Sequence, residues 1–125
     1  MTEPSLPDRL RAYDPARPDP GLRYSVLTAL GYQFEYQRWY SPAGEPVSPP
    51  DNVLTSLDFA FSQIPAGWCA RIWQGHQGCV ANLYRPNIDE LGISSPSVPH
   101  PAVALLLAIL AAREIDAAAA KEATP

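Results

Sequence analysis

Apolar residues recur at helical spacing in the first third of the chain. Leu22, Val26 and Leu30 fall four residues apart, which places them on one face of a helix. An aspartate–proline pair precedes them, and such a pair starts helices because the aspartate caps the first turn and the proline needs no partner there. The pattern therefore predicts a helix near residues 20–30.

The pattern then changes from a helical to an alternating period. Phe34 and Tyr36 alternate with polar residues, and period two with a high aromatic content is typical of a strand. We expect a strand near residues 33–41. A proline- and glycine-containing turn follows it, and Val47 is expected to begin a short return strand.

Helical spacing returns in the middle of the chain, at Leu57, Phe61 and Ile64. These positions predict a short helix near residues 55–64, which a proline and a glycine end.

Two strand-like runs follow this helix, near residues 68–74 and 79–85. The loop between them, Gly75-His76-Gln77-Gly78, has a glycine at each edge, which indicates a hairpin. Residues 87–99 show no regular pattern and are interpreted as a long loop. A last helix is predicted near residues 100–115, and its first turns are apolar all round.

The order helix, strand, helix, strand, strand, helix predicts an α+β fold. Its helices would pack on a small antiparallel sheet of three to four strands. We expect one domain over residues 19–116, a flexible Pro-rich tail over 1–18 and an Ala-rich flexible tail over 117–125. The predicted core consists of Leu22, Val26, Leu30, Phe34, Tyr36, Leu57, Phe61, Ile64, Trp68, Ile72, Val80, Tyr84, Val103, Leu106, Leu107 and Leu110.

Composition and charge limit the binding partners and the cellular compartment that we expect. The net charge is −4 and no run of Lys and Arg occurs, so direct binding of nucleic acid through a basic face is disfavoured. The longest apolar run, residues 102–112, is about half of the roughly 20 residues that a membrane span needs. The first residues have neither a basic start nor an apolar centre, so we expect no signal peptide. Two cysteines are too few for a disulfide scaffold, and we expect a cytoplasmic protein.

Several short segments together resemble the phage ABA sandwich domain family. They are Trp39 to Val47, Leu54 to Asp58, Ile64 to Trp68 and Leu83 to Pro86, followed by the apolar helix that begins near His100. The resemblance covers roughly residues 22–115 and implies a bacteriophage or prophage origin and a fold of helices and a sheet. The family has no assigned function, so the resemblance implies no catalytic or ligand-binding residue. The Pro-rich start and the Ala-rich end of this chain depart from the family pattern.

Two constellations suggest chemistry but lack a recognised pattern. Cys69, His76, Cys79 and His100 are possible zinc ligands, yet their spacing matches no known zinc motif, and buried small cysteines are the alternative. Cys79 and His76 as nucleophile and base lack a third, orienting residue. We therefore expect no metal, no cofactor and no enzymatic activity.

A set of arginines and aromatic residues on the predicted strands is the candidate binding site. An arginine beside an aromatic residue on a sheet can bind a phosphate and stack a base. The alternative is that helices cover both faces, so that the tryptophans are core and the arginines reach the rim. The candidate ligand-binding residues are Arg38, Trp39, Arg71, Trp73, Tyr84 and Arg85.

The last helix also suggests self-association. Leu105 and Ile109 lie opposite Val103 and Leu106, and a small sheet cannot easily cover both sides. We expect a homo-oligomer, most simply a two-fold dimer with this helix at the contact. The alternative is that the N-terminal tail covers the outer side.

These observations favour a small non-enzymatic phage or prophage accessory protein in the host cytoplasm. It would bind and neutralise a host factor, either a protein or a small signalling nucleotide, as a counter-defence protein. The alternative is a phage assembly or gene-regulation protein with a purely structural role.

Overall fold

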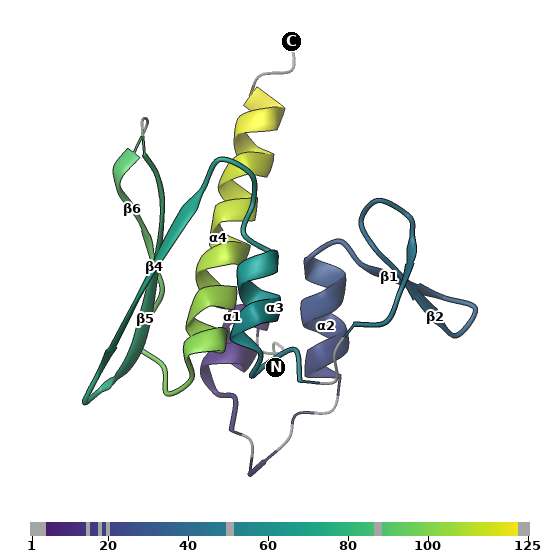
Figure 1. Cartoon of the computed structure of the whole chain (residues 1–125), viewed down its shortest axis with the longest axis horizontal. Coiled ribbons are helices and arrows are strands. Elements are labelled where there is room, and N and C mark those ends of the chain that lie inside the picture. Colours follow the sequence, from purple (N-terminus) through teal and green to yellow (C-terminus); the bar gives the residue numbers. More distant parts are fainter. Residues whose placement is uncertain are drawn as a thin grey trace. The chain divides into compact units, whose positions relative to one another are not determined.

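The structure is a computed structural model that describes residues 5–14, 16–17, 19, 21–49, 52–86 and 89–122, except for the side chains of 89–91 and 121–122. Its contacts group into two compact units, residues 1–54 and 55–125. The first unit holds α1 (Leu6–Arg11), α2 (Leu22–Ala29), β1 (Gln33–Glu35), β2 (Arg38–Tyr40) and β3 (Pro46–Val47). The second holds α3 (Leu57–Ser62), β4 (Cys69–Gly75), β5 (Gly78–Arg85), β6 (Asp89–Ser94) and α4 (Pro101–Glu122) (Figure 1).

The predicted α+β class is confirmed. The strands form two three-stranded antiparallel sheets, in the orders β1-β2-β3 and β4-β5-β6. The predicted helices are present as α2, α3 and α4, and the predicted hairpin is formed by β4 and β5. None of the helices in the described ranges combines the length and the hydrophobicity that a membrane span requires.

The prediction of one strand over residues 33–41 is wrong, because a tight turn divides this segment into β1 and β2. Tyr36 and Gln37 form the turn with φ values of 52° and 62°, and Glu35 pairs with Arg38 across it. Aromatic and polar residues keep alternating through a two-residue turn, so the pattern did not reveal it. Phe34 and Tyr36 are consequently not core residues, since they are 45% and 93% exposed. The return strand expected at Val47 is present as β3.

The first residues contain a helix, α1, where the sequence predicts a tail without regular structure. Ser5 caps it by accepting a hydrogen bond from the Asp8 N–H, and Leu10 is fully buried. Arg9 holds Asp19 through two hydrogen bonds of 2.9 and 3.0 Å, so α1 is tied to the start of α2. The buried Leu10 and the bonds of Arg9 to Asp19 and Ser25 place this helix, and these contacts produce no periodic pattern. The mobility of this segment in solution stays a prediction.

The loop expected over residues 87–99 is also a wrong prediction, because β6 lies within it. A bulge interrupts the β5–β6 register between Leu83 and Arg85, and Gly92 adopts a φ of 68°. Beyond β6, Val98 exchanges backbone hydrogen bonds of 2.6 and 3.0 Å with Cys79. A bulge breaks the period of two, which is why the segment shows no strand pattern.

The long helix α4 is the centre of the second unit. It contacts β5 on one side and α3 on the other, and Figure 1 shows it between the sheet and α3. Every residue from 102 to 109 is buried. The Trp68 Nε1–H, at the start of the hairpin, donates to Asp116 Oδ2 on this helix over 3.1 Å.

Seven of the sixteen predicted core residues are confirmed as buried, six are half-buried and three are exposed. Phe61 is 44% exposed on α3 and is not a core residue. Leu105 and Ile109 are fully buried, so the expected exposed stripe on α4 is wrong. The homo-oligomer itself stays a prediction, but this helix no longer supports it. Predicted core residues that are buried are Leu22, Val26, Leu30, Trp68, Val103, Leu106 and Leu107, while Leu57, Ile64, Ile72, Val80, Tyr84 and Leu110 are half-buried.

Candidate functional site

The predicted set of arginines and aromatic residues is divided among three surfaces. Arg38 and Trp39 lie on β2 in the first unit, and the other four lie on the β4–β5 hairpin of the second. Within this hairpin, Cys69 pairs with Tyr84, so Arg71, Trp73 and Tyr84 lie on one face of the sheet. We call this face, which is turned away from α4, the outer face.

The outer face carries an exposed arginine stacked on a tyrosine. The Arg71 guanidinium carbon lies 4.3 Å from the centre of the Tyr84 ring. Trp73 is 53% exposed and lines a pocket with Val80 and Ser97 beside the hairpin turn. The alternative interpretation, in which every tryptophan is a core residue, is therefore wrong for Trp73 and correct for Trp68.

Arg85 lies on the opposite face of the hairpin and does not join this group. Its guanidinium carbon lies 4.7 Å from the centre of the Trp68 ring. Its Nε is buried and has no hydrogen-bond partner in the described part of the chain. Arg85 and Arg71 therefore cannot bind one ligand on one face.

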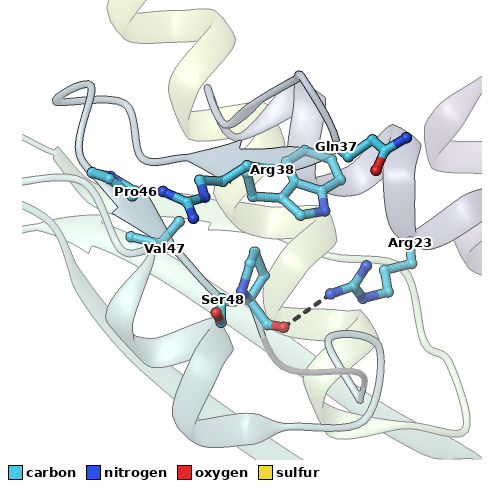
Figure 2. Close-up of a pocket in the computed structure, with 8 residues that line it drawn as sticks. Arg23, Gln37, Arg38, Pro46, Val47 and Ser48 are labelled. Carbon is cyan, nitrogen blue, oxygen red and sulfur yellow. Dashed lines mark hydrogen bonds between the residues drawn. The ribbon is translucent and has the colours of Figure 1, made fainter.

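A pocket of about 570 Å³ in the first unit contains the other two predicted residues. Arg38 and Trp39 line it from β2, and an arginine that the sequence did not indicate, Arg23, lines it from α2. Figure 2 shows that the side chains of Arg23 and Arg38 both reach toward the segment that holds Val47 and Ser48. The other lining residues are Gln37, Pro46, Val47, Ser48 and Pro49.

Local contacts hold the pocket walls in place. The Arg23 Nη2–H donates to the Pro49 carbonyl oxygen over 2.9 Å, which links α2 to the segment after β3 (Figure 2). The Trp39 ring centre lies 5.1 Å from that of Phe34 and 5.4 Å from that of Tyr24. Tilted aromatic contacts of this kind are worth about 0.5–1.5 kcal/mol beyond their area burial, so they restrict the indole.

The turn at the rim of the pocket is strained. Tyr36 and Gln37 both adopt left-handed backbone conformations without being glycine or asparagine. A left-handed conformation costs about 1–2 kcal/mol for such residues, and strain of this kind concentrates at ligand sites. The turn places Gln37 and Arg38 directly at the pocket.

The charge in the pocket is positive. In the described ranges, the Arg38 guanidinium takes part in no hydrogen bond or ion pair, although Glu35 lies opposite Arg38 in the hairpin register. Arg38 is also exposed. Among the lining residues there is no His, Cys, Asp or Glu, so the pocket offers no general acid or base near neutral pH. Its chemistry is suited to binding an anion and a flat ring.

The residues considered for zinc or nucleophilic chemistry do not assemble. Cys69 and Cys79 are free thiols on opposite faces of the β4–β5 hairpin. His76 is exposed in the hairpin turn. Among the described residues, no group of three or more His, Cys, Asp or Glu side chains could hold a metal ion.

Sequence reasoning missed Arg23 because it has the ordinary appearance of a polar residue on a helix. The sequence shows only that Arg23 follows Leu22, a predicted core residue, at the start of the first predicted helix, and this position does not indicate a binding role. Its role depends on the return of the chain through β3, which a local pattern cannot show.

Comparison with known proteins finds no matching family model, no matching curated protein and no matching solved structure. The resemblance to the phage ABA sandwich domain family therefore stays a prediction from the sequence.

Proposed function

We propose that this chain is a non-enzymatic binding protein whose pocket at Arg23, Arg38 and Trp39 takes a small anionic ligand with a flat ring, such as a nucleotide. The observation that carries the proposal is a pocket lined both by the exposed Arg38 guanidinium, which has no ion-pair partner in the described ranges, and by an indole restricted by two other rings. Guanidinium groups bind phosphate through paired hydrogen bonds, and indole rings stack on bases.

The shape of the pocket supports a small ligand rather than a long polymer. It is bounded by a turn, a helix and the proline-containing segment after β3, and its size falls within the usual range for small-molecule sites, about 300–1,000 Å³. The negative net charge of the chain weakens binding of long nucleic acids through nonspecific attraction. A local positive site on an acidic protein favours a small anion.

The biological setting of the proposal comes from the family resemblance. A phage or prophage accessory protein that sequesters a small signalling nucleotide of its host would act by stoichiometric binding. Such a role would need no catalytic residues. A host protein as partner, or a role in phage assembly or gene regulation, is the alternative that the experiment must separate.

Isothermal titration with a panel of linear and cyclic nucleotides, and with inorganic pyrophosphate as the ring-free probe, tests the proposal. We expect at least one nucleotide to bind more tightly than pyrophosphate. Arg38→Gln should weaken that binding by about tenfold or more, because a charge-assisted hydrogen bond is worth about 1.5–3 kcal/mol.

Arg17→Gln is the matched control, since it removes the same charge from an exposed residue of the same unit that does not line the pocket. Equal weakening by both variants would indicate a nonspecific charge effect and refute the site. Failure of every nucleotide to bind, together with a host protein that co-purifies in native mass spectrometry, would favour the alternative function.

A further inference from the structure

Strand β4 lies at the edge of the second sheet and lacks the features that usually prevent an edge strand from pairing with another chain. In the described structure β4 pairs only with β5, so its other edge has no strand neighbour. Its seven residues pair with β5 without a register shift. Exposed edges are usually protected by prolines, bulges, short strands or several charges. β4 has neither a proline nor a bulge, and Arg71 is its single charged residue.

The other strand edges are less suitable for pairing. β6 carries a bulge and a glycine with positive φ, and a proline follows it at Pro96. β1 and β3, at the edges of the first sheet, have only three and two residues. Among the described strands, β4 is therefore the long, regular edge.

The backbone groups that β4 presents at this edge can be identified from the bonds of β5. Cys79 exchanges both of its backbone bonds with Val98, and the carbonyl of Ala81 accepts from the Ser95 N–H, so these two residues face the β6 side. Their partners on β4, Gln74 and Ile72, consequently direct their N–H and C=O groups away from β5. By the same alternation, Ala70 does so as well.

We propose that two copies of this chain pair antiparallel through their β4 edges, with Ile72 of each copy on the two-fold axis. This register uses all three outward-facing residues, because Ile72 pairs with its own copy and Ala70 pairs with Gln74 of the other. It joins the two three-stranded sheets into one continuous sheet.

The side chains on the outer face favour this register over the one centred on Arg71. With Ile72 on the axis, Arg71 of each copy lies directly opposite Trp73 of the other, and arginine with tryptophan is a favourable cation–π pair. Centring on Arg71 would place two arginines opposite each other, and like charges in that position are destabilising. Arg71 already stacks on Tyr84 within its own sheet, so the contact would extend an existing row of rings.

The pairing also accounts for an otherwise unexplained exposed tryptophan. Trp73 is 53% exposed and Arg71 is exposed in the single chain. In the dimer both side chains would lie at the centre of the contact, where tryptophan and arginine contribute most to protein interfaces. The contact differs from the α4 contact expected from the sequence and does not depend on the nucleotide pocket.

Sedimentation velocity over a concentration series tests the dimer directly. We expect a concentration-dependent monomer–dimer equilibrium in the micromolar range, because edge pairing buries less than a standard interface of roughly 1,200–2,000 Å². A strict monomer up to about 0.5 mM, far above that range, would overturn the proposal.

Two substitutions at one position test the register. Trp73→Glu places a carboxylate opposite Arg71 of the other copy and should retain the dimer, whereas Trp73→Lys places like charges together and should weaken dimerisation at least tenfold. If both variants are monomeric, the register is wrong; if both remain equally dimeric, or if only Trp73→Lys is dimeric, β4 is not the contact.

A second pair of substitutions, at Gln74, independently tests the backbone hydrogen bonds between the two copies. Gln74→Pro removes an N–H that faces the open edge and should weaken dimerisation, because proline is tolerated on edge strands but cannot donate across them. Gln74→Ala keeps the N–H and is the control, and circular dichroism checks that both variants fold. Dimerisation that Gln74→Pro leaves unchanged would overturn the proposal.

Discussion

Gly92 determines the shape of β6, and its replacement by alanine is the sharpest test of the second sheet. Its φ is 68°, in the left-handed region. A Cβ placed on it would overlap the carbonyl oxygen of Leu83, and it would lie 3.0 Å from both the Leu83 carbonyl carbon and the Tyr84 Cβ. These atoms belong to the central strand β5, so they cannot move aside as the end of a flexible side chain would.

The expected effect has two parts that a control separates. An alanine in the left-handed region costs about 1–2 kcal/mol. Overpacking against a rigid neighbour adds about 1–3 kcal/mol. Gly67→Ala isolates the first part, because Gly67 has a φ of 89° and its Cβ would meet no atom within 4 Å. We therefore expect Gly92→Ala to destabilise the protein by about 1–3 kcal/mol more than Gly67→Ala does.

Urea unfolding followed by tryptophan fluorescence measures both variants, since Trp68 is buried in the same unit. The free energy of unfolding is obtained by linear extrapolation. Equal destabilisation by Gly92→Ala and Gly67→Ala would refute the reasoning, because it would mean that β5 and β6 separate at the bulge without loss of free energy.

Three further predictions follow from single contacts. Leu83→Ala should destabilise by about 2–5 kcal/mol in urea unfolding, because Leu83 is fully buried in the central strand, and Phe61→Ala should destabilise by clearly less, because that ring is 44% exposed; equal losses would contradict these burials. Gln37→Gly should raise the midpoint of thermal unfolding by relieving about 1 kcal/mol of left-handed strain, and an unchanged or lower midpoint would indicate an unstrained turn. The hydrogen bond from Arg9 lowers the pKa of Asp19 below its ordinary value of 3.8, so the ion pair stabilises the folded state above that value and is lost as the pH falls through the lowered pKa. Asp19→Asn should therefore reduce the protection of α1 from hydrogen exchange at pH 6, and the protection should then fall less steeply as the pH is lowered. If the protection of the variant falls as steeply as that of the unchanged protein, other carboxylates cause the fall.

Local patterns in the sequence were sufficient to predict the elements that have a regular period and clear start or stop residues. The spacing of Leu22, Val26 and Leu30 identified α2, because a helix that buries one face must repeat apolar residues at its own period. The glycines at the edges of the hairpin turn identified β4 and β5. Residue type alone also selected arginines and aromatic residues as the candidate binding groups.

The irregular elements were not predicted from the sequence because their stability comes from partners distant in the sequence. α1 depends on Leu10 and on the bond from Arg9 to Asp19, and neither forms a repeat. The turn at Tyr36 lacks the asparagine–glycine signal, and β6 depends on a bulge that conceals its alternation.

The grouping of the candidate residues was decided only by the tertiary structure. The sequence could state that Tyr84 and Arg85 lie on opposite faces of one strand, but not which of them shares a face with Arg71. Pairing of Cys69 with Tyr84 places Tyr84 beside Arg71 and sends Arg85 to the other side. Likewise, only the return of the chain through β3 brings Pro49 to Arg23 and forms the pocket. Side-chain direction alternates at every residue of a strand, so a shift of one residue in register would exchange the faces, and register depends on long-range contacts that no local pattern contains.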